Sequence, residues 1–343
     1  MKFILGIAAG KGGVGKSTLT VNLALCLQKM GKRVGIMDAD IYGPSIPKML
    51  PEERPALLKG EKIIPAEKNG IQLLSVAYFL KEKEQAMIAR APIVNGIIKQ
   101  FFHSVDWGEL DCLLIDFPPG TGDIHLTLLQ EGCLSGGVVI TTPQHVALQD
   151  VQKAIALFRH MQVPLFGLVE NMSFFCDPSS CKRYYPFGRG GGRLLSQQEG
   201  IPFLGEIPIE EEISRCCDAG ISLFEVSQQS ESAKAYTALA KEIWEQLERG
   251  YLKNFKLVSK IYQKDRYQFT IEWADGKISD YRLSQVQRLC NCAKCREASK
   301  CVDEDVEARQ IISVGRYALR IDFTNGCSKG IYPFSLLYGL EAT

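Results

Sequence analysis

Apolar residues in the first 250 positions fall into short continuous runs that are separated by longer stretches with helical periodicity. The runs at 3–8, 33–38 and 111–116 are too short for helices and carry charged residues only at their ends, as in strands buried on both faces of a sheet. Between the first two runs, the stretch 19–29 has apolar residues at helical spacing. Strands that alternate with helices predict an α/β fold whose mostly parallel sheet is covered by helices on both faces.

The last helical pattern of this block covers residues 232–249. Gly250 follows it and predicts the end of the helix, so we place the first domain at residues 1–250. An amphipathic helix can also tether a protein to a membrane, but residues 251–343 still follow it, which favours packing against the sheet. The apolar positions that recur at helical spacing are Leu239, Ile243, Trp244 and Leu247.

Residues 251–343 follow a different pattern. The segments 267–273 and 317–323 alternate apolar and polar positions, as half-buried strands do. The pairs Asp275-Gly276 and Asn325-Gly326 come directly after them and are typical of hairpin turns. We therefore expect a small β-rich second domain.

Composition and net charge limit the classes of partner and compartment that we expect for this protein. The 343 residues are 46% hydrophobic and 23% charged, which is typical of a globular protein with two domains. Forty basic against 39 acidic residues leave a net charge of +1, so no overall charge favours nucleic acid or an anionic membrane as partner. We expect a cytoplasmic protein without a signal peptide, a membrane span or a leading domain.

Twelve cysteines in such a protein are better explained as metal ligands, reactive thiols or core residues than as disulfides. Cys26, Cys112 and Cys133 lie in apolar contexts and are expected in the core. The histidines at positions 103, 125, 145 and 160 show no spacing typical of a metal site, and no role is assigned to them.

The segment GKGGVGKST lies between the first predicted strand and the first predicted helix and matches the phosphate-loop pattern completely. Its glycines permit close approach of phosphates, its second lysine supplies charge, and its serine offers a hydroxyl to Mg²⁺. A plain glycine turn is the alternative that we weigh against it. The predicted nucleotide-binding residues are Gly10, Lys11, Gly12, Gly13, Val14, Gly15, Lys16, Ser17 and Thr18.

Carboxylates follow two further predicted strands. Asp38 and Asp40 stand where the second strand ends, at the edge where open α/β sheets bind ligands; a turn cluster is the alternative. Asp116 ends the strand DCLLID and precedes FPPGTGD, an arrangement in which it would hold Mg²⁺ through water. Gly120 and Gly122 then predict a mobile loop that senses the γ-phosphate.

These motifs together point to a family. In their order and spacing, GKGGVGKST, DADIYGPS, DFPPGTGDIHLTL, TTPQHVALQDV and VENMSFF closely resemble the Mrp/ApbC iron–sulfur carrier ATPases, a branch of the nitrogenase-iron-protein and MinD/ParA superfamily of P-loop NTPases. The resemblance covers residues 2–249. It implies a homodimer with two ATP sites at the interface and an iron–sulfur cluster that bridges the subunits.

The resemblance also implies roles for individual residues. Lys11 marks the deviant phosphate loop of this group and would reach the nucleotide of the partner subunit. Asp40 would orient the attacking water and support Mg²⁺. Asn171, and the backbone near Pro208, would contact adenine.

Cys176 and Cys181 are the predicted cluster ligands. Two thiolates from each subunit of a symmetric dimer would supply the four ligands of a [4Fe–4S] cluster. Family members usually carry Cys-x-x-Cys, whereas four residues separate these two cysteines, and the following KRYYPFG resembles the chloroplast branch of the family. Loop cysteines without metal are the alternative, and the adjacent Cys216 and Cys217 are substitute candidates.

A second group of cysteines lies in the β-rich domain. Its segments IEWADGKISDYRLSQVQRLCNCAKC and VGRYALRIDFTNGCSKGIYPFSLL resemble the zinc-binding N-terminal domain of γ-butyrobetaine hydroxylase, in which the fourth ligand is a histidine. Cys301 is a rival for that fourth position, and surface thiols are the alternative. Four thiolates leave no open coordination position, so we expect a structural Zn²⁺ and no hydroxylase chemistry. The predicted ligands are Cys290, Cys292, Cys295 and Cys327.

The function predicted from all of this is an ATPase that holds a [4Fe–4S] cluster transiently and transfers it to apo-proteins. Lys11, Lys16 and Asp40 would be its catalytic residues. A positioning ATPase of the MinD/ParA class that binds membrane or DNA would explain the phosphate loop equally well, but not DFPPGTGD or the cysteines. A third hypothesis is a regulator in which the C-terminal cysteines sense metal.

Overall fold

The computed structural model describes residues 2–40, 43–60, 62–78, 91–132, 134–177, 179–180, 182–254, 258–273, 276–290, 302–314, 318–327 and 330–340. The chain divides into two compact units, Met1–Leu247 and Glu248–Thr343. Each unit is described by itself below.

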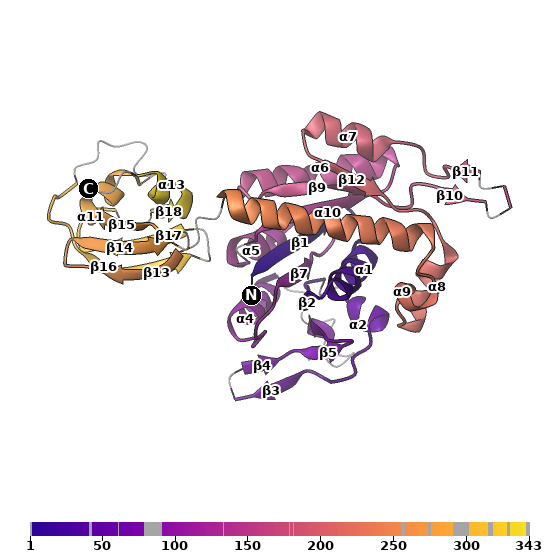
Figure 1. The fold of residues 1–343 in the computed structure, drawn as a ribbon, viewed down its shortest axis with the longest axis horizontal. Coiled ribbons are helices and arrows are strands. Elements are labelled where there is room, and N and C mark those ends of the chain that lie inside the picture. The colour runs from indigo at the N-terminus through magenta and orange to yellow at the C-terminus, as the bar shows by residue number, and fades with distance from the viewer. Residues whose placement is uncertain are drawn as a thin grey trace. The chain divides into compact units, whose positions relative to one another are not determined.

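A single mixed sheet organises the first unit (Figure 1). All of its strand pairs are parallel except the pair at one edge, β5 with β6. The central strands are buried at every position except Ile4 of β1, which is half-buried, as the continuous apolar runs predict. In spatial order the strands are β12 (Phe203–Glu206), β9 (Leu165–Glu170), β8 (Gly136–Thr141), β1 (Phe3–Ala9), β7 (Cys112–Asp116), β2 (Val34–Asp38), β6 (Ile71–Ser75) and β5 (Ala66–Lys68).

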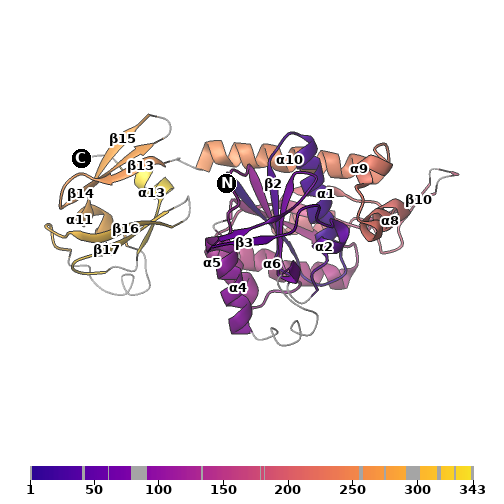
Figure 2. The ribbon, with the colours of Figure 1, turned by 90° about the horizontal axis from the view of Figure 1, so that it is seen from below.

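Helices cover both faces of this sheet (Figure 2). On one face lie α1 (Lys16–Lys29) and α10 (Glu231–Asn254), where the ring of Trp244 meets that of Phe3 edge-on at 5.4 Å. On the other face lie α4 (Ala91–His103), α5 (Asp123–Glu131) and α6 (His145–His160), which bury one apolar cluster against the strands. The predicted α/β fold is therefore confirmed.

Shorter elements surround the sheet. A two-stranded hairpin, β10 (Phe175–Cys176) with β11 (Arg183–Tyr184), extends away from the first unit (Figure 1). The remaining elements of this unit are α2 (Ile46–Met49), β3 (Leu57–Lys59), β4 (Lys62–Ile64), η1 (Val76–Tyr78), α7 (Gly191–Glu199), α8 (Glu211–Ala219) and α9 (Leu223–Val226).

The end of the last helix was predicted wrongly. Helix α10 continues through Gly250 to Asn254. An isolated glycine costs a helix only about 1 kcal/mol relative to alanine. The residues Tyr251, Leu252 and Lys253 that follow it can all continue a helix, so this glycine does not act as a stop.

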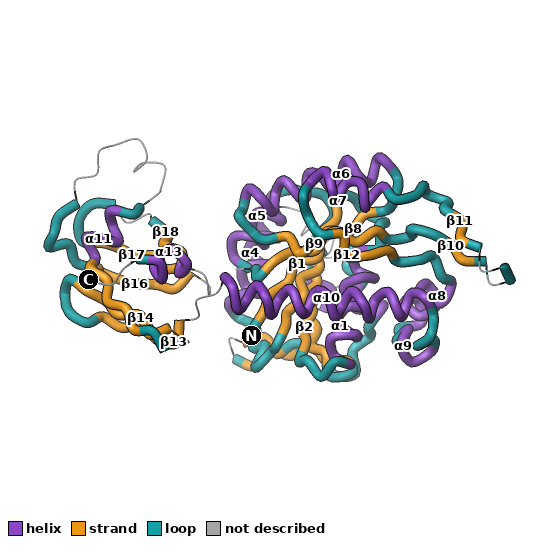
Figure 3. Tube along the Cα trace, turned by 45° about the horizontal axis from the view of Figure 1, so that its top comes forward, coloured by secondary structure: helices purple, strands orange, loops and turns teal. Residues whose placement is uncertain are grey.

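The second unit consists of one β-β-β-α motif that occurs twice (Figure 3). Strands β16 and β17 each begin 50 residues after their counterparts β13 and β14, and both sheets are three-stranded and antiparallel. The prediction of a β-rich region is confirmed, while the repeat itself was not predicted. The first copy is β13 (Val258–Gln263), β14 (Gln268–Trp273), β15 (Ile278–Arg282) and α11 (Leu283–Arg288); the second is β16 (Ala308–Val314), β17 (Ala318–Phe323), β18 (Ile331–Pro333) and α13 (Phe334–Gly339).

Both copies contribute to one apolar core, which includes Ile271 and Ile321 at matching positions of β14 and β17. The hairpin turn of each copy also contacts the helix of the other. After the first turn, Lys277 Nζ donates to the carbonyl of Tyr338 on α13 at 3.1 Å. At the second turn, the carbonyl of Asn325 accepts from Gln287 Nε2 on α11 at 2.7 Å.

Candidate functional site

The phosphate loop joins β1 to α1 in a conformation that only glycine accepts at several positions. Gly13 and Gly15 have φ angles of 78° and 88°, and Gly15 is the residue that precedes the helix. A Cβ atom on Gly15 would lie 2.1 Å from Nδ2 of Asn171, and one on Gly10 would lie 2.0 Å from the carbonyl carbon of Asp150. These positions cannot carry a side chain without displacing backbone or Asn171.

Four predicted residues converge at the end of this loop. Lys16 Nζ lies 2.8 Å from Oδ2 of Asp116 and 3.8 Å from Oδ2 of Asp40. The Ser17 hydroxyl donates to the same Asp116 oxygen at 2.5 Å. Carboxylate and hydroxyl oxygens are the ligands that Mg²⁺ takes beside nucleotide phosphates, so this donor set fits a Mg²⁺–nucleotide complex.

Two further side chains hold the carboxylates and were not predicted. The Thr20 hydroxyl donates to Oδ1 of Asp116 at 2.9 Å, and the Ser75 hydroxyl donates to Oδ2 of Asp38 at 3.1 Å. Thr20 could have been found, because it lies one helical turn after Lys16 on the same face of α1. Ser75 ends β6, and nothing in the sequence pairs that strand with β2.

Asp38, at the end of β2, titrates differently from an ordinary carboxyl. Asp38 and Asp116 stand opposite each other on β2 and β7. Burial, and then the charge of Asp116, raise the pKa of Asp38 to about 8. Burial also raises the pKa of Asp40, although the nearby Lys16 ammonium opposes this shift. Burial therefore favours the protonated form of Asp38, while the Lys16 ammonium forms an ion pair with Asp116.

The other predicted loop residues differ in exposure. Lys11 and Thr18 are half-buried, Gly12 and Gly13 are exposed, and Val14 is buried. The exposed turn is thus the part of the loop that another molecule can reach.

The two residues predicted to contact adenine follow neighbouring strands. Asn171 comes directly after β9, is 6% exposed, and donates from Nδ2 to the carbonyl of Val14 in the phosphate loop at 2.8 Å. Pro208 is buried and follows β12 by one residue, after Ile207, whose N–H donates to the carbonyl of Glu170 at 2.9 Å. The fold therefore places Asn171 against the phosphate loop. No hydrogen bond among the described residues joins Pro208 to that loop.

Of the predicted cluster ligands, Cys176 ends β10 and is half-buried, while Cys181 lies outside the described residues. The turn of the hairpin is held by Asp177, which accepts hydrogen bonds from the Ser179 and Ser180 hydroxyls at 2.8 and 2.6 Å. These bonds lower the pKa of the Asp177 carboxyl. The hairpin thus has a defined turn beside the thiol.

The remaining cysteines of the first unit lie in two environments. Cys26 and Cys112 are buried, as predicted, and burial raises the pKa of each thiol to about 12. Cys216 and Cys217 belong to α8, and burial raises both pKa values, although a hydrogen bond with Thr18 opposes the shift at Cys217. These substitute candidates are therefore next to α1 and not on the hairpin. Cys133 lies outside the described residues.

The second unit brings two predicted zinc ligands together. The sulfur atoms of Cys290 and Cys327 lie 3.7 Å apart, although 37 residues separate them in the chain. Four sulfurs placed tetrahedrally at about 2.3 Å from Zn²⁺ are about 3.8 Å from one another, so this pair fits two corners of such a site. Cys292, Cys295 and the rival Cys301 lie outside the described residues.

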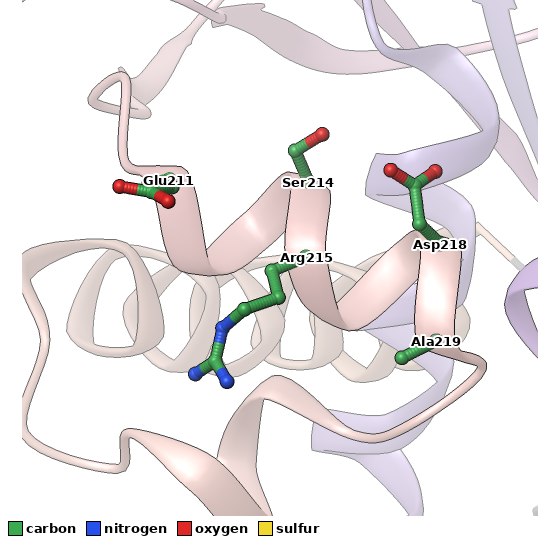
Figure 4. A pocket seen from close by; sticks show the side chains of 5 residues that line it. All are labelled: Glu211, Ser214, Arg215, Asp218 and Ala219. Atoms are coloured by element: carbon green, nitrogen blue, oxygen red, sulfur yellow. The ribbon is translucent and has the colours of Figure 1, made fainter.

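A surface hollow of about 560 Å³ lies along α8 (Figure 4). None of its lining residues belongs to the phosphate loop or to the cysteine hairpin, and we assign it no role. The lining residues are Glu211, Ser214, Arg215, Asp218 and Ala219.

The comparisons with known proteins bear on both units. A family model described as NUBPL iron-transfer P-loop NTPase matches residues 1–244. The chain belongs to this family. Residues 261–338 match a second model, described as γ-butyrobetaine hydroxylase-like, N-terminal. Both predicted resemblances are confirmed, and as a P-loop NTPase the chain is an ATPase.

Relatives of this NUBPL-family chain carry matching names. It is 43% identical to an iron-sulfur cluster carrier protein of Aquifex aeolicus over 70% of this chain and 67% of the relative. It is 37% identical to the chloroplastic Fe-S cluster assembly factor HCF101 of rice over 98% of this chain. The alignment covers only 64% of the rice protein, so this chain spans less than two thirds of that relative.

Solved structures of the family and its neighbours share the fold. A nucleotide-binding protein from Archaeoglobus fulgidus, solved in complex with ADP, is 37% identical with a TM-score of 0.56 and covers 67% of this chain and 93% of its own. The cell division ATPase MinD of Pyrococcus furiosus has a TM-score of 0.55 at 23% identity, over 71% of this chain and 99% of its own. The likeness to MinD shows the fold alone. Across the described residues, no helix has the length and apolarity that crossing a bilayer requires.

His125, for which the sequence predicts no role, packs against the loop that follows Asp116. It is 1% exposed, and its ring centre lies 5.6 Å from that of Phe117. Burial lowers its pKa to about 4, although the carbonyl of Pro118 opposes this shift. The imidazole is therefore neutral at pH 7.

We expect this histidine to make the fold acid-sensitive. His125 binds its proton near pH 6.5 in the unfolded chain but only near pH 4 in the folded chain. The folded state therefore keeps its full unfolding free energy above pH 6.5 and loses part of it as the pH falls from 6.5 to 4. The loss amounts to about 3 kcal/mol of unfolding free energy. In urea unfolding, the stability lost between pH 7 and pH 4 should be about 3 kcal/mol smaller in His125→Phe than in the wild type. His160→Phe, at an exposed position of α6, should behave like the wild type.

Proposed function

We propose that this protein is an ATPase whose cargo is a [4Fe–4S] cluster, held by Cys176 and Cys181 and transferred to apo-proteins. One structural observation supports this proposal independently of the family match. Asn171, which contacts the phosphate loop, and Cys176 are only five residues apart, on either side of the turn that follows β9. A nucleotide site and a candidate cluster ligand are thus attached to one short segment.

The proposed nucleotide chemistry uses the residues at the loop. Ser17, Asp40 and Asp116 would hold Mg²⁺, which neutralises charge on the phosphates when bound. Lys16 would then turn from Asp116 to the outer phosphates, because Mg²⁺ and its ammonium compete for the same Asp116 oxygen. Asp40 would orient the attacking water.

We further propose a homodimer. Two hairpins related by a two-fold axis would supply the four thiolates that a [4Fe–4S] cluster needs. Lys11 is half-buried beside the exposed Gly12 and Gly13 and would reach the nucleotide of the partner. Asn171 and the backbone near Pro208 would hold adenine.

A structural Zn²⁺ in the second unit completes the proposal. Its ligands would be Cys290, Cys292, Cys295 and Cys327, and the 3.7 Å separation of the first and last supports this set. We propose the cytoplasm as its compartment, because thiols that bind metal must stay reduced. We expect neither nucleic acid nor a membrane as a binding partner.

The two lysines of the loop should separate binding from hydrolysis. Lys16→Ala removes the charge beside the phosphates and should abolish measurable ATP binding. Lys11→Ala should bind ATP nearly normally in each subunit but slow hydrolysis by about a thousandfold, as when a charge supplied in trans is lost. Titration calorimetry and phosphate release measure the two effects. Hydrolysis by Lys11→Ala at the wild-type rate would show that Lys11 is not such a finger.

The cluster ligands are tested by anaerobic reconstitution followed by absorption and Mössbauer spectroscopy. The wild type should take up about one [4Fe–4S] cluster per dimer, as four thiolate ligands require. A Cys176→Ala/Cys181→Ala variant should take up none, whereas the matched Cys216→Ala/Cys217→Ala variant should bind like the wild type. A hairpin variant that still binds and transfers a full cluster would reject the assigned ligands.

The zinc site is tested by metal analysis of the full-length protein. We expect about one Zn²⁺ per chain, and its loss together with a lower melting temperature in Cys290→Ser and in Cys327→Ser. Cys217→Ser, a thiol of the first unit, is the control and should retain zinc. Wild-type protein purified without zinc would contradict the assignment.

A further inference from the structure

Glu170 is a buried carboxylate that has no part in the nucleotide chemistry above. It is the last residue of β9, is fully buried, and lies in register with Thr141 of β8 and Glu206 of β12. No ion pair recorded for the described part of the chain includes it. Burying a carboxylate without a cation costs free energy that only hydrogen bonds can offset.

Two donors provide that compensation, one to each carboxylate oxygen. Oε1 accepts from the Ser173 hydroxyl at 2.7 Å, and Oε2 accepts from the backbone N–H of Gly192 at 2.5 Å. Gly192 lies in the first turn of α7, where N–H groups have no partner within the helix and where the helix dipole favours a negative charge. Glu170 therefore joins the start of α7 to the end of β9.

The fit at this contact depends on glycine. A Cβ atom on Gly192 would lie 2.9 Å from Oε2 of Glu170, and one on Gly191 would lie 2.7 Å from the carbonyl of Pro143. The helix start can approach the carboxylate this closely only because both residues lack a side chain.

On one side, the carboxylate is adjacent to the nucleotide site. Asn171 follows Glu170 directly, and its side chain donates to Val14 in the phosphate loop at 2.8 Å. The next residue, Met172, has a φ of 54°, a left-handed conformation that a methionine adopts only where the surroundings impose it. The turn from Glu170 to Ser173 is thus held tightly at both ends.

On the other side, the same turn leads into the cysteine hairpin. The Ser173 N–H donates to the carbonyl of Ile207 at 3.0 Å, and the Ile209 N–H donates to the carbonyl of Phe174 at 2.7 Å. The guanidinium of Arg183, on β11, lies 4.1 Å from the ring centre of Phe174. These contacts connect the base of the hairpin to the turn that Glu170 holds.

We propose that Glu170 is the positioning residue through which occupation of the phosphate loop alters the reactivity of Cys176. This proposal rests on the proposed function. In this proposal the buried carboxylate connects three features, which are the contact of Asn171 with the phosphate loop, the start of α7 and the cysteine hairpin. Gln in its place would keep the volume but direct an amide donor at the hydroxyl or at the N–H, so one of the two bonds would be lost.

The test uses full-length, cluster-free protein and the rate at which a maleimide alkylates Cys176, with and without Mg²⁺–ATP. Peptide fragmentation distinguishes Cys176 from Cys181. In the wild type we expect ATP to change the rate by about fivefold, a modest coupling between two sites. In Glu170→Gln the change should fall below about twofold, while in Ser173→Ala, which removes one donor, it should be intermediate.

Glu206→Gln is the matched control, because it makes the same substitution in register on the neighbouring strand, at a position 29% exposed. It should retain the wild-type response. A purely structural role would shift the melting temperature and alter both labelling rates together, leaving their ratio unchanged. If Glu170→Gln does not fold, Ser173→Ala decides the matter.

A full response to ATP in Glu170→Gln and Ser173→Ala, or no response in the wild type, would overturn the proposal. Because labelling is done without a cluster, such a failure leaves the reconstitution result untouched. Conversely, a wild type that responds to ATP but takes up no iron would refute the cargo and not the connection.

Discussion

The contact between the Lys16 ammonium and the Asp116 carboxylate is the interaction on which the nucleotide site depends. The two groups lie 2.8 Å apart with side chains 7% and 0% exposed, so each charge offsets part of the cost of burying the other. Removing one partner of such a pair typically costs about 3–5 kcal/mol. The ends of β1, β7 and β2 must therefore lie next to one another before the site exists, and the parallel sheet is what brings them together.

How much the sequence predicted depends on how far apart the interacting residues are in the chain. The phosphate loop was predictable because strand, glycine turn and helix are contiguous, and Asp116 because it ends an apolar run. Ser75, and the contact of Glu170 with Gly192, were missed because the partners lie on other strands and helices. Gly250 was misread because a single glycine is a weak signal, and a tertiary or local preference easily overrides it.

The residues given roles here divide into two chemical classes with different requirements. The nucleotide site uses oxygen and nitrogen donors at the edge of a rigid sheet, where burial shifts the pKa values of Asp38 and Asp40. The hairpin cysteine lies outside that rigid frame, next to an acidic turn with three hydroxyl or amide donors to Asp177. The buried hydrogen bonds of Glu170 lie between the nucleotide site and the hairpin. They do not involve the phosphate loop or the aspartates at the strand ends.

The repeated motif of the second unit has a consequence for its sulfur atoms. Cys327 follows the second hairpin turn at the position where Lys277 follows the first, and Lys277 closes its corner with the Tyr338 carbonyl at 3.1 Å and the Tyr338 ring at 4.3 Å. In the first copy, this corner is thus closed by the contacts of Lys277 with Tyr338. In the second copy, it is closed by the pair of thiols from Cys290 and Cys327. The repeated fold by itself therefore does not require a metal, because its first copy closes the same corner without thiols. The Zn²⁺ that we propose would follow from the cysteines of the second corner alone.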